Sequence, residues 1–211
     1  MVLAQTGQFI LASFAFTAAD HQLATWFHAR LNGTTGPLLQ AISFAAGPAL
    51  MFNVLVSGVL FLAWKRRWHA LASLVLTVPC GVLAGEALKL IVRRQRPYLV
   101  GPFVDWVGYS FPSGHAISAT LLYGFLAVCL WRVIQGRHWR AVTVFVASVL
   151  ALAVGFSRIA LGAHYLTDVV AGTIFGGLWL TVCTTGMGVL RRRFDVADSA
   201  VPDGSTALVA P

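Results

Sequence analysis

Long apolar runs separated by short polar breaks dominate this chain. A helix that crosses a bilayer needs about twenty predominantly apolar residues. By that measure the sequence predicts six membrane segments, at residues 3–19, 38–64, 69–92, 115–134, 141–161 and 166–190. The first is short for a full span, and the second is long enough to tilt or to begin in the interface. We therefore expect an all-α integral membrane protein, a bundle of about six transmembrane helices.

A different periodicity marks the polar break at residues 20–32. Its apolar positions follow an i, i+3, i+4, i+8 pattern: Leu23, Trp26, Phe27 and Leu31. This stripe predicts a short amphipathic helix lying at the membrane interface. No Lys or Arg precedes the run at 9–19, so the positive region of a secretory signal is missing, and we expect this segment to be retained. We expect a single domain at residues 1–194, followed by a disordered cytoplasmic tail at 195–211.

Composition supports the membrane class. The chain is 58% hydrophobic and 10% charged, whereas soluble domains are about a quarter charged. A formal net charge of +8 would suggest nucleic acid in a soluble protein, but these cations stand at the ends of apolar runs rather than on a solvated face. We therefore expect no nucleic-acid partner. The scattered Cys80, Cys129 and Cys183 suggest helix packing rather than a disulfide framework.

The cations also predict an orientation. Three clusters fall on one side of a six-span chain: Lys65, Arg66, Arg67, then Arg132, Arg137, Arg140, then Arg191, Arg192, Arg193. The positive-inside tendency assigns that side, and the C-terminus, to the cytoplasm. The opposite side holds Arg30, Lys89, Arg93, Arg94, Arg96 and Arg158. A bound anion would explain cations gathered on that side.

The first polar segment carries Lys89 and Arg96, which are seven residues or two helical turns apart and should share one face, joined there by Arg93. Pro97 should end the helix near that point. A cation at mid-bilayer costs about 2.5–3.5 kcal/mol on insertion scales, so we interpret both as phosphate ligands at the membrane boundary. For Arg94 we expect snorkelling to lipid headgroups.

The second segment is Pro112-Ser113-Gly114-His115, at the start of an apolar run. Ser113 is a good N-cap, and a helix N-terminus is an anion site. Gly114 allows close backbone approach, and His115 has the chemistry of a proton donor. An ordinary capped helix with an incidental histidine explains this tetrapeptide alone equally well.

The third segment places Arg158, His164 and Asp168 within eleven residues. The carboxylate, four residues after the histidine, can hold its ring in one tautomer, and the guanidinium fork fits phosphate oxygens. We expect no metal or cofactor, because the chain has few carboxylates. A zinc site of His115, His164 and Asp168 is a disfavoured alternative, since the cations would repel a metal.

Together the segments resemble the three signature motifs of the type 2 phosphatidic acid phosphatase superfamily: Lys89-x6-Arg96-Pro97, Pro112-Ser113-Gly114-His115 and Ser157-Arg158-x5-His164-x3-Asp168. The resemblance implies a helical bundle with its site on the extracytoplasmic face. It implies that His164 attacks phosphorus, that Asp168 orients it and that His115 protonates the leaving group. The phosphoryl ligands that it implies are Lys89, Arg96, Ser113, Gly114 and Arg158.

We therefore expect metal-independent hydrolysis of a membrane lipid phosphate or diphosphate through a phosphohistidine. An isoprenyl diphosphate or phosphatidylglycerophosphate is the expected substrate type; lipid A and phosphatidic acid stay open. We expect a bacterial cytoplasmic (inner) membrane, with the site facing the periplasm or exterior. A phosphotransferase using the same phosphohistidine is the nearest alternative, and a non-catalytic anion or lipid transporter is a more distant one.

Overall fold

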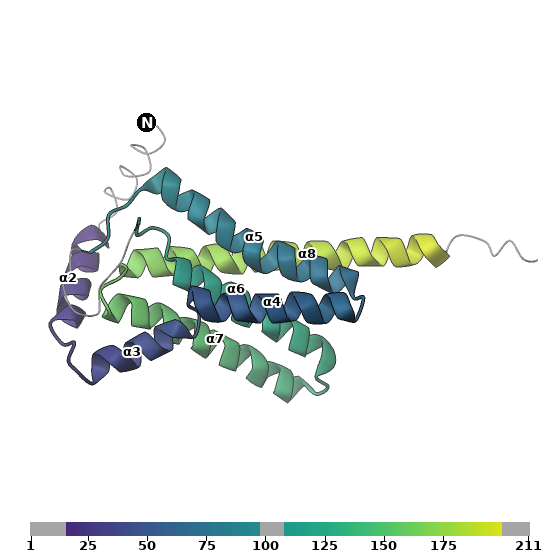
Figure 1. Ribbon diagram of the computed structural model, residues 1–211, viewed down its shortest axis with the longest axis horizontal. Helices are drawn as coiled ribbons and strands as arrows, with labels where there is room; N and C mark the ends of the chain where they lie inside the picture. Colours follow the sequence, from purple (N-terminus) through teal and green to yellow (C-terminus); the bar gives the residue numbers. More distant parts are fainter. Residues whose placement is uncertain (1–15, 98–107, 200–211) are drawn as a thin grey trace, which may run out of the picture.

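A computed structural model describes residues 16–97 and 108–199, with side chains at 18–97 and 108–190. The described chain is helical and contains no strand. Its helices, labelled in Figure 1, are α2 (Phe16–His28), α3 (Thr35–Phe44), α4 (Pro48–Trp64), α5 (Trp68–Val92), α6 (Gly114–Val133), α7 (Arg137–Ala160) and α8 (Leu166–Ser199). Most of the predicted segment at 3–19 lies outside the described residues. Helix α8 reaches Ser199, inside the segment predicted as a tail, and residues 200–211 also lie outside.

Five helical stretches in the described part are long and apolar enough to cross a membrane: Thr35–Trp64, Trp68–Val92, Gly114–Val133, Arg137–Ala160 and Leu166–Leu190. They agree with the last five predicted segments to within a few residues, which confirms the all-α membrane class. Many large apolar side chains on their outer faces are exposed, including Phe52, Phe145 and Val182. Lipid would cover such side chains in a membrane.

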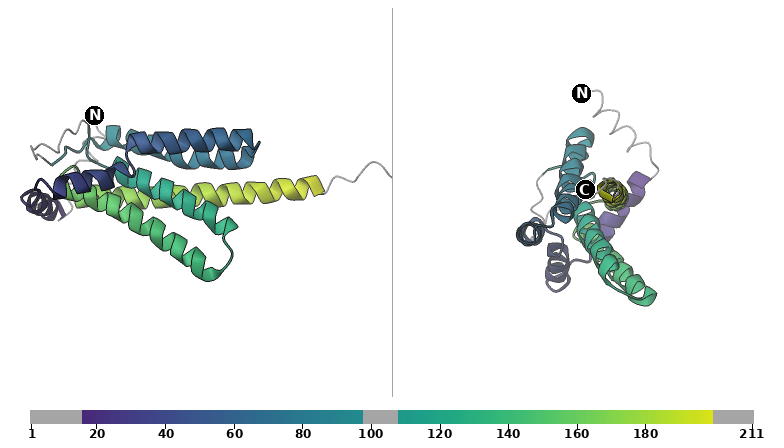
Figure 2. Two further views of the ribbon diagram at one scale, coloured as in Figure 1. Left: turned by 60° about the horizontal axis from the view of Figure 1, so that its bottom comes forward. Right: turned by 90° about the vertical axis from the view of Figure 1, so that its right-hand side faces the viewer.

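Helix α6 forms the centre of the bundle and contacts α5, α7 and α8 (Figures 1 and 2). Its small and branched side chains pack into the main core, where Ile117 and Leu121 meet Val78 of α5. Side chains of α4 and α8 cover the edge of this cluster. The N-terminal end of α6 is thereby fixed among its neighbours, and this end carries the second motif.

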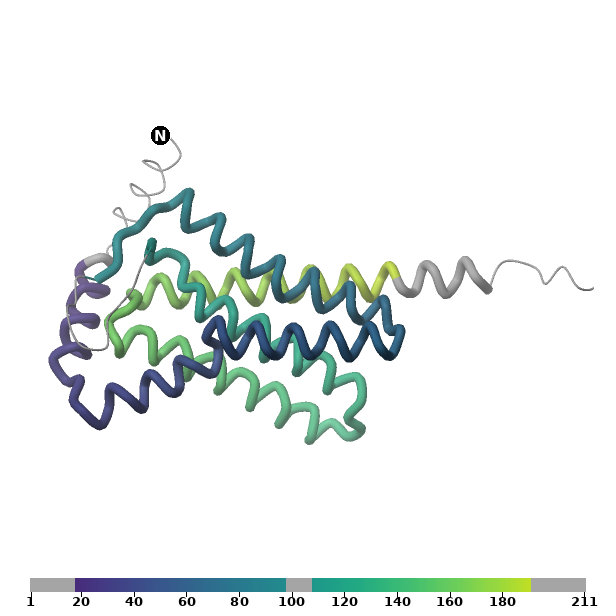
Figure 3. The backbone as a smooth tube through the Cα atoms, in the orientation of Figure 1, coloured from purple at the N-terminus to yellow at the C-terminus, as the bar shows by residue number. Residues whose placement is uncertain are grey.

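The predicted segment at 38–64 is broken in the structure. Helix α3 ends at Phe44 and α4 begins at Pro48, and Figure 3 shows the change of direction between them. Pro48 follows Gly47 and favours a helix start, because proline lacks the N–H that an earlier turn would need. The Tyr123 hydroxyl donates to the carbonyl of Ala45 at 2.6 Å, which satisfies a backbone group freed by the break.

Helix α2 lies across one end of the bundle, beside the end of α7 and the start of α8 (Figure 1). Leu23 and Phe27 of the predicted stripe pack against a cluster that contains Ile159 and Val169, whereas Trp26 is half exposed. The C-terminal ends of α4, α6 and α8 lie at the opposite end of the bundle. The three predicted cytoplasmic clusters therefore share one end of the molecule, remote from the motif residues.

Candidate active site

The three motif segments converge at the end of the bundle that α2 crosses. A pocket of about 440 Å³ opens there between α4, α5 and α6. Six predicted site residues line it: Lys89, Arg96, Gly114, His115, Arg158 and His164. Asp168 and Ser113 lie behind this lining and are fully buried. The structure thus brings together all eight residues that the sequence predicted.

The path of the chain after α5 differs from the prediction. Helix α5 ends at Val92, and Arg93 adopts a left-handed conformation with φ 53°. Lys89 and Arg96 therefore do not share a helical face. They meet at one pocket because the chain turns at Arg93 and leads Arg96 back over the third motif. The Arg96 Nη1 donates to the Ala163 carbonyl at 3.0 Å, and its Nε donates to the Gly108 carbonyl at 3.0 Å.

Lys89 approaches the pocket from the last turn of α5. Its Nζ pairs with Glu86 at 2.7 Å, one turn earlier on the same helix. A Cβ on Gly114 would lie only 3.0 Å from this Nζ and 3.2 Å from the Glu86 carboxylate. The glycine therefore leaves the space that the ion pair occupies at the start of α6.

Helix α6 begins as the sequence predicted. Ser113 is its N-cap, and the Ser113 hydroxyl accepts from the Ala116 amide at 3.4 Å. The Ser113 amide donates to the carbonyl of Asp168 at 3.0 Å, which fixes this end of α6 against the start of α8. Gly172 permits that approach, since a Cβ there would lie 2.8 Å from the Ser113 carbonyl oxygen. His115, one residue inside the helix, faces the pocket.

Arg158 reaches the pocket from the last turn of α7. Its side chain is only 2% exposed, and its Nη1 donates to the hydroxyl of Ser43 at 2.8 Å. Ser43 lies near the end of α3, which packs beside α7 and stops at Phe44. The Arg158 carbonyl accepts from the amides of Ala163 and His164, and the tight turn includes Gly162 at φ 69°. Arginine and histidine of the third motif are thus connected through the backbone.

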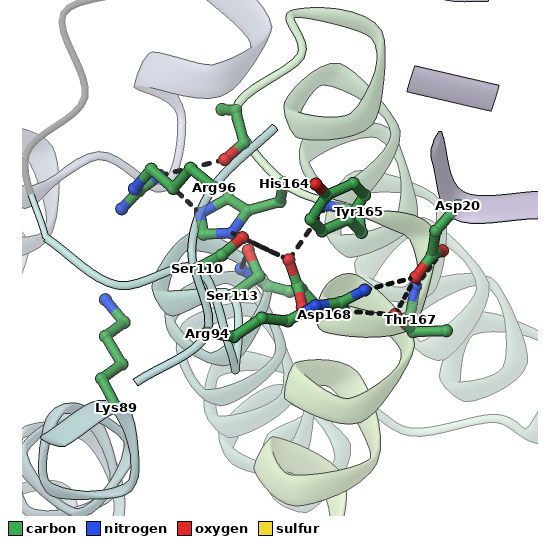
Figure 4. Close-up of polar contacts among 12 residues, drawn as sticks. Asp20, Lys89, Arg94, Arg96, Ser110, Ser113, His164, Tyr165, Thr167 and Asp168 are labelled. Carbon is green, nitrogen blue, oxygen red and sulfur yellow. Dashed lines mark hydrogen bonds and ion pairs between the residues drawn. The ribbon is translucent and has the colours of Figure 1, made fainter. Parts of the chain in front are cut away.

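His164 lies between Arg96 and Asp168 (Figure 4). Its Nε2 is 3.3 Å from Nη1 of Arg96, and its Nδ1 is 3.7 Å from Oδ2 of Asp168. Because a guanidinium only donates, Nε2 must be the acceptor, and the proton of the neutral ring is on Nδ1. The Ser110 hydroxyl is 3.4 Å from Nδ1 and donates to Oδ2, so it bridges the pair. The Nε2 lone pair therefore faces the cationic side of the site.

Asp168 is held by further donors. Its Oδ2 also accepts from the Tyr165 amide at 3.0 Å, and its Oδ1 accepts from Nη1 of Arg94 at 2.7 Å. The prediction that Arg94 snorkels to headgroups is wrong. Its guanidinium points inward, contacts the Tyr165 ring at 4.2 Å and pairs with Asp20 at 2.9 Å. Two buried carboxylates hold the arginine inside the protein more strongly than an exposed headgroup would.

Burial and charge set the protonation of His164. Burial lowers the pKa of His164 to about 4; Arg96 and Arg158 act in the same direction, and Asp168 opposes them. Burial also lowers the pKa of Arg96, partly offset by Asp168 and Glu86. Burial disfavours the charged form of Arg94 too, but Asp168 and Asp20 outweigh it and raise the pKa of that guanidinium. At neutral pH the site therefore holds a neutral His164 beside cations that favour an anion.

The described residues offer no group of three or more His, Cys, Asp or Glu side chains placed to hold a metal ion. His164 and Asp168 contact Ser110 and two arginines, whose positive charge opposes a metal cation at the zinc site that was disfavoured above. The three cysteines are free and lie on α5, α6 and α8. The arginines around His164 therefore suit an oxyanion ligand rather than a metal cation.

Comparison with known proteins gives the family. The PAP2 superfamily matches residues 68–192, more than half of the chain, and this stretch contains all three motifs. The chain belongs to the PAP2 superfamily. The resemblance drawn from the motifs is thereby confirmed.

PAP2 relatives include phosphatidylglycerophosphatase B of Bacillus subtilis, which is 31% identical over 80% of this chain and 79% of its own length. Lipid A 1-phosphatase of Rhizobium etli is 31% identical over 63% of this chain and 55% of its own length. The chain therefore spans little more than half of that relative. The undecaprenyl-diphosphatase of Sulfolobus acidocaldarius is 30% identical over 58% of this chain and 57% of its own length.

Solved PAP2 structures share the fold. A transmembrane PAP2-type phosphatidylglycerolphosphate phosphatase from Bacillus subtilis superimposes with a TM-score of 0.74 at 24% identity, covering 87% of this chain and 92% of that one. LpxE of Aquifex aeolicus gives a TM-score of 0.61 at 19% identity, covering 82% of this chain and 97% of that one.

Four residues contact the predicted site residues but were not predicted to do so from the sequence: Asp20, Ser43, Arg94 and Ser110. Asp20 carried one usable signal, because it is an acid at the edge of an apolar stripe. Ser43 and Ser110 carried none, since serine is common in both helices and loops. Their roles depend on the break after α3 and on the return of the chain before α6.

Proposed function

We propose that this PAP2 membrane phosphatase hydrolyses a lipid phosphate or diphosphate through a phosphohistidine on His164, without a metal. The family and its named relatives support a membrane lipid phosphatase. The observation that carries the finer proposal is the shape and lining of the pocket. One end is cationic, and the other end is apolar and runs between α4 and α5.

The cationic end fits a phosphoryl group. Arg96 and Arg158 supply positive charge, Lys89 adds a cation that Glu86 partly offsets, and the start of α6 supplies backbone amides. The apolar end fits a hydrocarbon chain, because its lining includes Met51, Phe52, Leu55, Val82 and Leu83. A phosphate on a lipid tail matches both ends, whereas a soluble phosphate ester would use only the first.

In the first step the Nε2 lone pair of His164 attacks phosphorus, and the bond from phosphorus to the leaving oxygen breaks. His115 gives a proton to that oxygen, which leaves on a lipid alcohol or, from a diphosphate, on a lipid monophosphate. Asp168 and Ser110 keep the Nδ1 proton in place and offset the positive charge that the phosphorylated ring acquires. The arginines and Lys89 stabilise the charge on the phosphoryl oxygens.

In the second step water attacks the phosphohistidine and gives its proton to His115. The bond between Nε2 and phosphorus breaks, inorganic phosphate leaves and His164 returns to its neutral form. A phosphotransferase would differ only in the acceptor, because a lipid hydroxyl would replace water. A transporter or carrier would need the cations but neither histidine, and its site would not require the relay from His164 to Asp168.

We further propose that the site faces the periplasm or exterior of a bacterial cytoplasmic membrane. The arginine clusters at the opposite end of the bundle support this orientation. Phosphatidylglycerophosphate and isoprenyl diphosphates are the proposed substrates. The named activities of the Bacillus and Sulfolobus relatives agree with these two classes.

The test is phosphate release by detergent-purified protein in EDTA, with phosphatidylglycerophosphate, undecaprenyl diphosphate and phosphatidic acid offered separately. The proposal predicts release from at least one of them by the wild type and none by His164→Ala. Release that requires added metal, or release that survives in His164→Ala, would overturn the mechanism. Transfer of the phosphoryl group to an added lipid alcohol, without free phosphate, would favour the phosphotransferase.

A further inference from the structure

A buried chain of charges runs from helix α2 to the reaction centre. Asp20 of α2 accepts from Nη2 of Arg94, and Nη1 of the same arginine donates to Asp168 (Figure 4). The residue Asp20 is only 3% exposed, and Asp168 is fully buried. Both contacts are short, at 2.9 and 2.7 Å, and they join residues more than seventy positions apart in the sequence.

The geometry around Asp168 shows what the arginine does. One carboxylate oxygen, Oδ2, faces Nδ1 of His164, and the Ser110 hydroxyl lies between them. The other oxygen, Oδ1, faces Arg94. A carboxylate fixed at both oxygens cannot rotate away from the imidazole, and the guanidinium beside it offsets the cost of a buried negative charge.

Asp20 in turn fixes the arginine. Its carboxylate accepts from the Thr167 amide at 3.2 Å and from the Thr167 hydroxyl, and that hydroxyl also accepts from Arg94 at 2.7 Å. The ring of Tyr165 covers the guanidinium at 4.2 Å. Arg94 is therefore held by residues of α2 and by the first turn of α8, which carries Asp168.

We propose that Arg94 and Asp20 are positioning residues of the phosphatase reaction, which act through Asp168 to hold His164 ready for attack. This inference rests on the proposed function. It makes α2 part of the catalytic machinery rather than a surface anchor alone. The reacting atoms touch neither residue, so the two should affect the rate of phosphoryl transfer and leave phosphate binding largely intact.

The test compares Arg94→Gln, Arg94→Lys and Asp20→Asn with the wild type in full-length, detergent-purified protein. Removing a catalytic aspartate that orients a histidine costs about 10⁴ in kcat, and the loss of its support should cost less. We expect about a 10²-fold fall in kcat for Arg94→Gln, a smaller fall for Asp20→Asn and partial recovery in Arg94→Lys. KM and the inhibition constant for inorganic phosphate should change less than threefold, which corresponds to about 0.6 kcal/mol of binding free energy.

The double variant shows whether Asp20 acts through the arginine. If it does, Asp20→Asn should have almost no further effect on kcat in the Arg94→Gln background. Arg93→Gln and Arg30→Gln each remove one exposed arginine, the first next to Arg94 and the second two residues after the end of α2, and should keep near wild-type kcat. Thermal unfolding in detergent identifies any variant that has failed to fold, and in that case Arg94→Lys and Asp20→Asn carry the comparison.

A folded Arg94→Gln with wild-type kcat would overturn the inference. So would losses that multiply independently in the double variant, or a rise in KM and in the phosphate inhibition constant that accounts for the whole effect. An inactive wild type would instead count against the proposed function, because the inference concerns only differences between active proteins.

Discussion

Arg94 and Arg96, separated by one residue, contact opposite sides of the pair formed by His164 and Asp168. Nη1 of Arg94 lies 2.7 Å from Oδ1 of the aspartate, and Nη1 of Arg96 lies 3.3 Å from Nε2 of the histidine. The histidine is therefore oriented from both sides by cations of one short segment. This segment follows α5 immediately and owes its direction to the left-handed turn at Arg93.

The first prediction concerns the shape of the Arg96 side chain. Arg96→Lys keeps the positive charge but cannot contact the carbonyls of Ala163 and Gly108 and the His164 ring together. We expect kcat to fall by about 10- to 100-fold, toward the cost of losing one positioned donor. Steady-state kinetics on a lipid substrate measure this. Arg93→Lys, at an exposed arginine three residues earlier, is the control, and an equal loss there would contradict the account.

The second prediction tests the space beside Lys89. Gly114→Ala would place a Cβ 3.0 Å from the Lys89 Nζ and 3.2 Å from the Glu86 carboxylate, so the ends of both side chains would have to shift by a few tenths of an ångström. We expect at least a tenfold loss of kcat/KM, about 1.4 kcal/mol in transition-state binding. Gly177→Ala is the matched control, because nothing lies within 4 Å of its added Cβ. Equal activities of the two variants, both folded, would show that the approach of Lys89 to α6 is unimportant.

Much of this site was predictable because its residues are informative in themselves. Histidine, lysine and arginine at the ends of apolar runs are costly, and their spacing matched a known pattern. Ser43 and Ser110 were not predictable, because a serine gains its role only from what the fold brings beside it. The α3–α4 break had a local signal in Gly47 and Pro48, and the prediction overlooked it in favour of the continuous apolar run.

Arg94 shows a different limit of the sequence. A cation beside a membrane helix end is usually exposed, so snorkelling was the ordinary interpretation. Its two partners, Asp20 and Asp168, lie 74 residues away on either side. Such distant pairing is a consequence of how α2 and α8 pack, which no local pattern near Arg94 reveals.

The third prediction follows from the lowered pKa of His164. The folded value is about 4, below the ordinary value of about 6.5, so the unfolded chain binds more protons between these two pH values. His164 should therefore lower the free energy of unfolding as the pH falls from about 6.5 to about 4. His164→Gln, which has no titrating side chain, should lose this part of the pH dependence.

The measurement is the apparent Tm of both proteins in detergent at pH 7.5 and pH 4.5. The wild type should lose more than the His164→Gln variant does over this interval. Parallel losses, or a larger loss in the variant, would mean that His164 has an ordinary pKa in the folded protein.

The fourth prediction concerns the apolar end of the pocket. Leu83→Trp should obstruct the space between α4 and α5 and raise KM for a long-chain lipid phosphate severalfold, because its hydrocarbon tail loses room. The rate with p-nitrophenyl phosphate, which has no tail, should not change. Leu178→Trp is a matched control, since Leu83 and Leu178 are similarly exposed, at 67% and 64%, and only the former lines the pocket. Equal effects of both variants on both substrates would contradict a tail path at this place.

The most direct test of the central claim is a rapid-quench experiment with ³²P-labelled lipid phosphate under single-turnover conditions, followed by mapping of the labelled peptide. The account predicts a label that is stable in alkali, labile in acid and located on His164. It should appear before free phosphate and be absent from His164→Asn. Release of phosphate with no labelled intermediate, or a label that persists in His164→Asn, would show that the reaction does not proceed through this histidine.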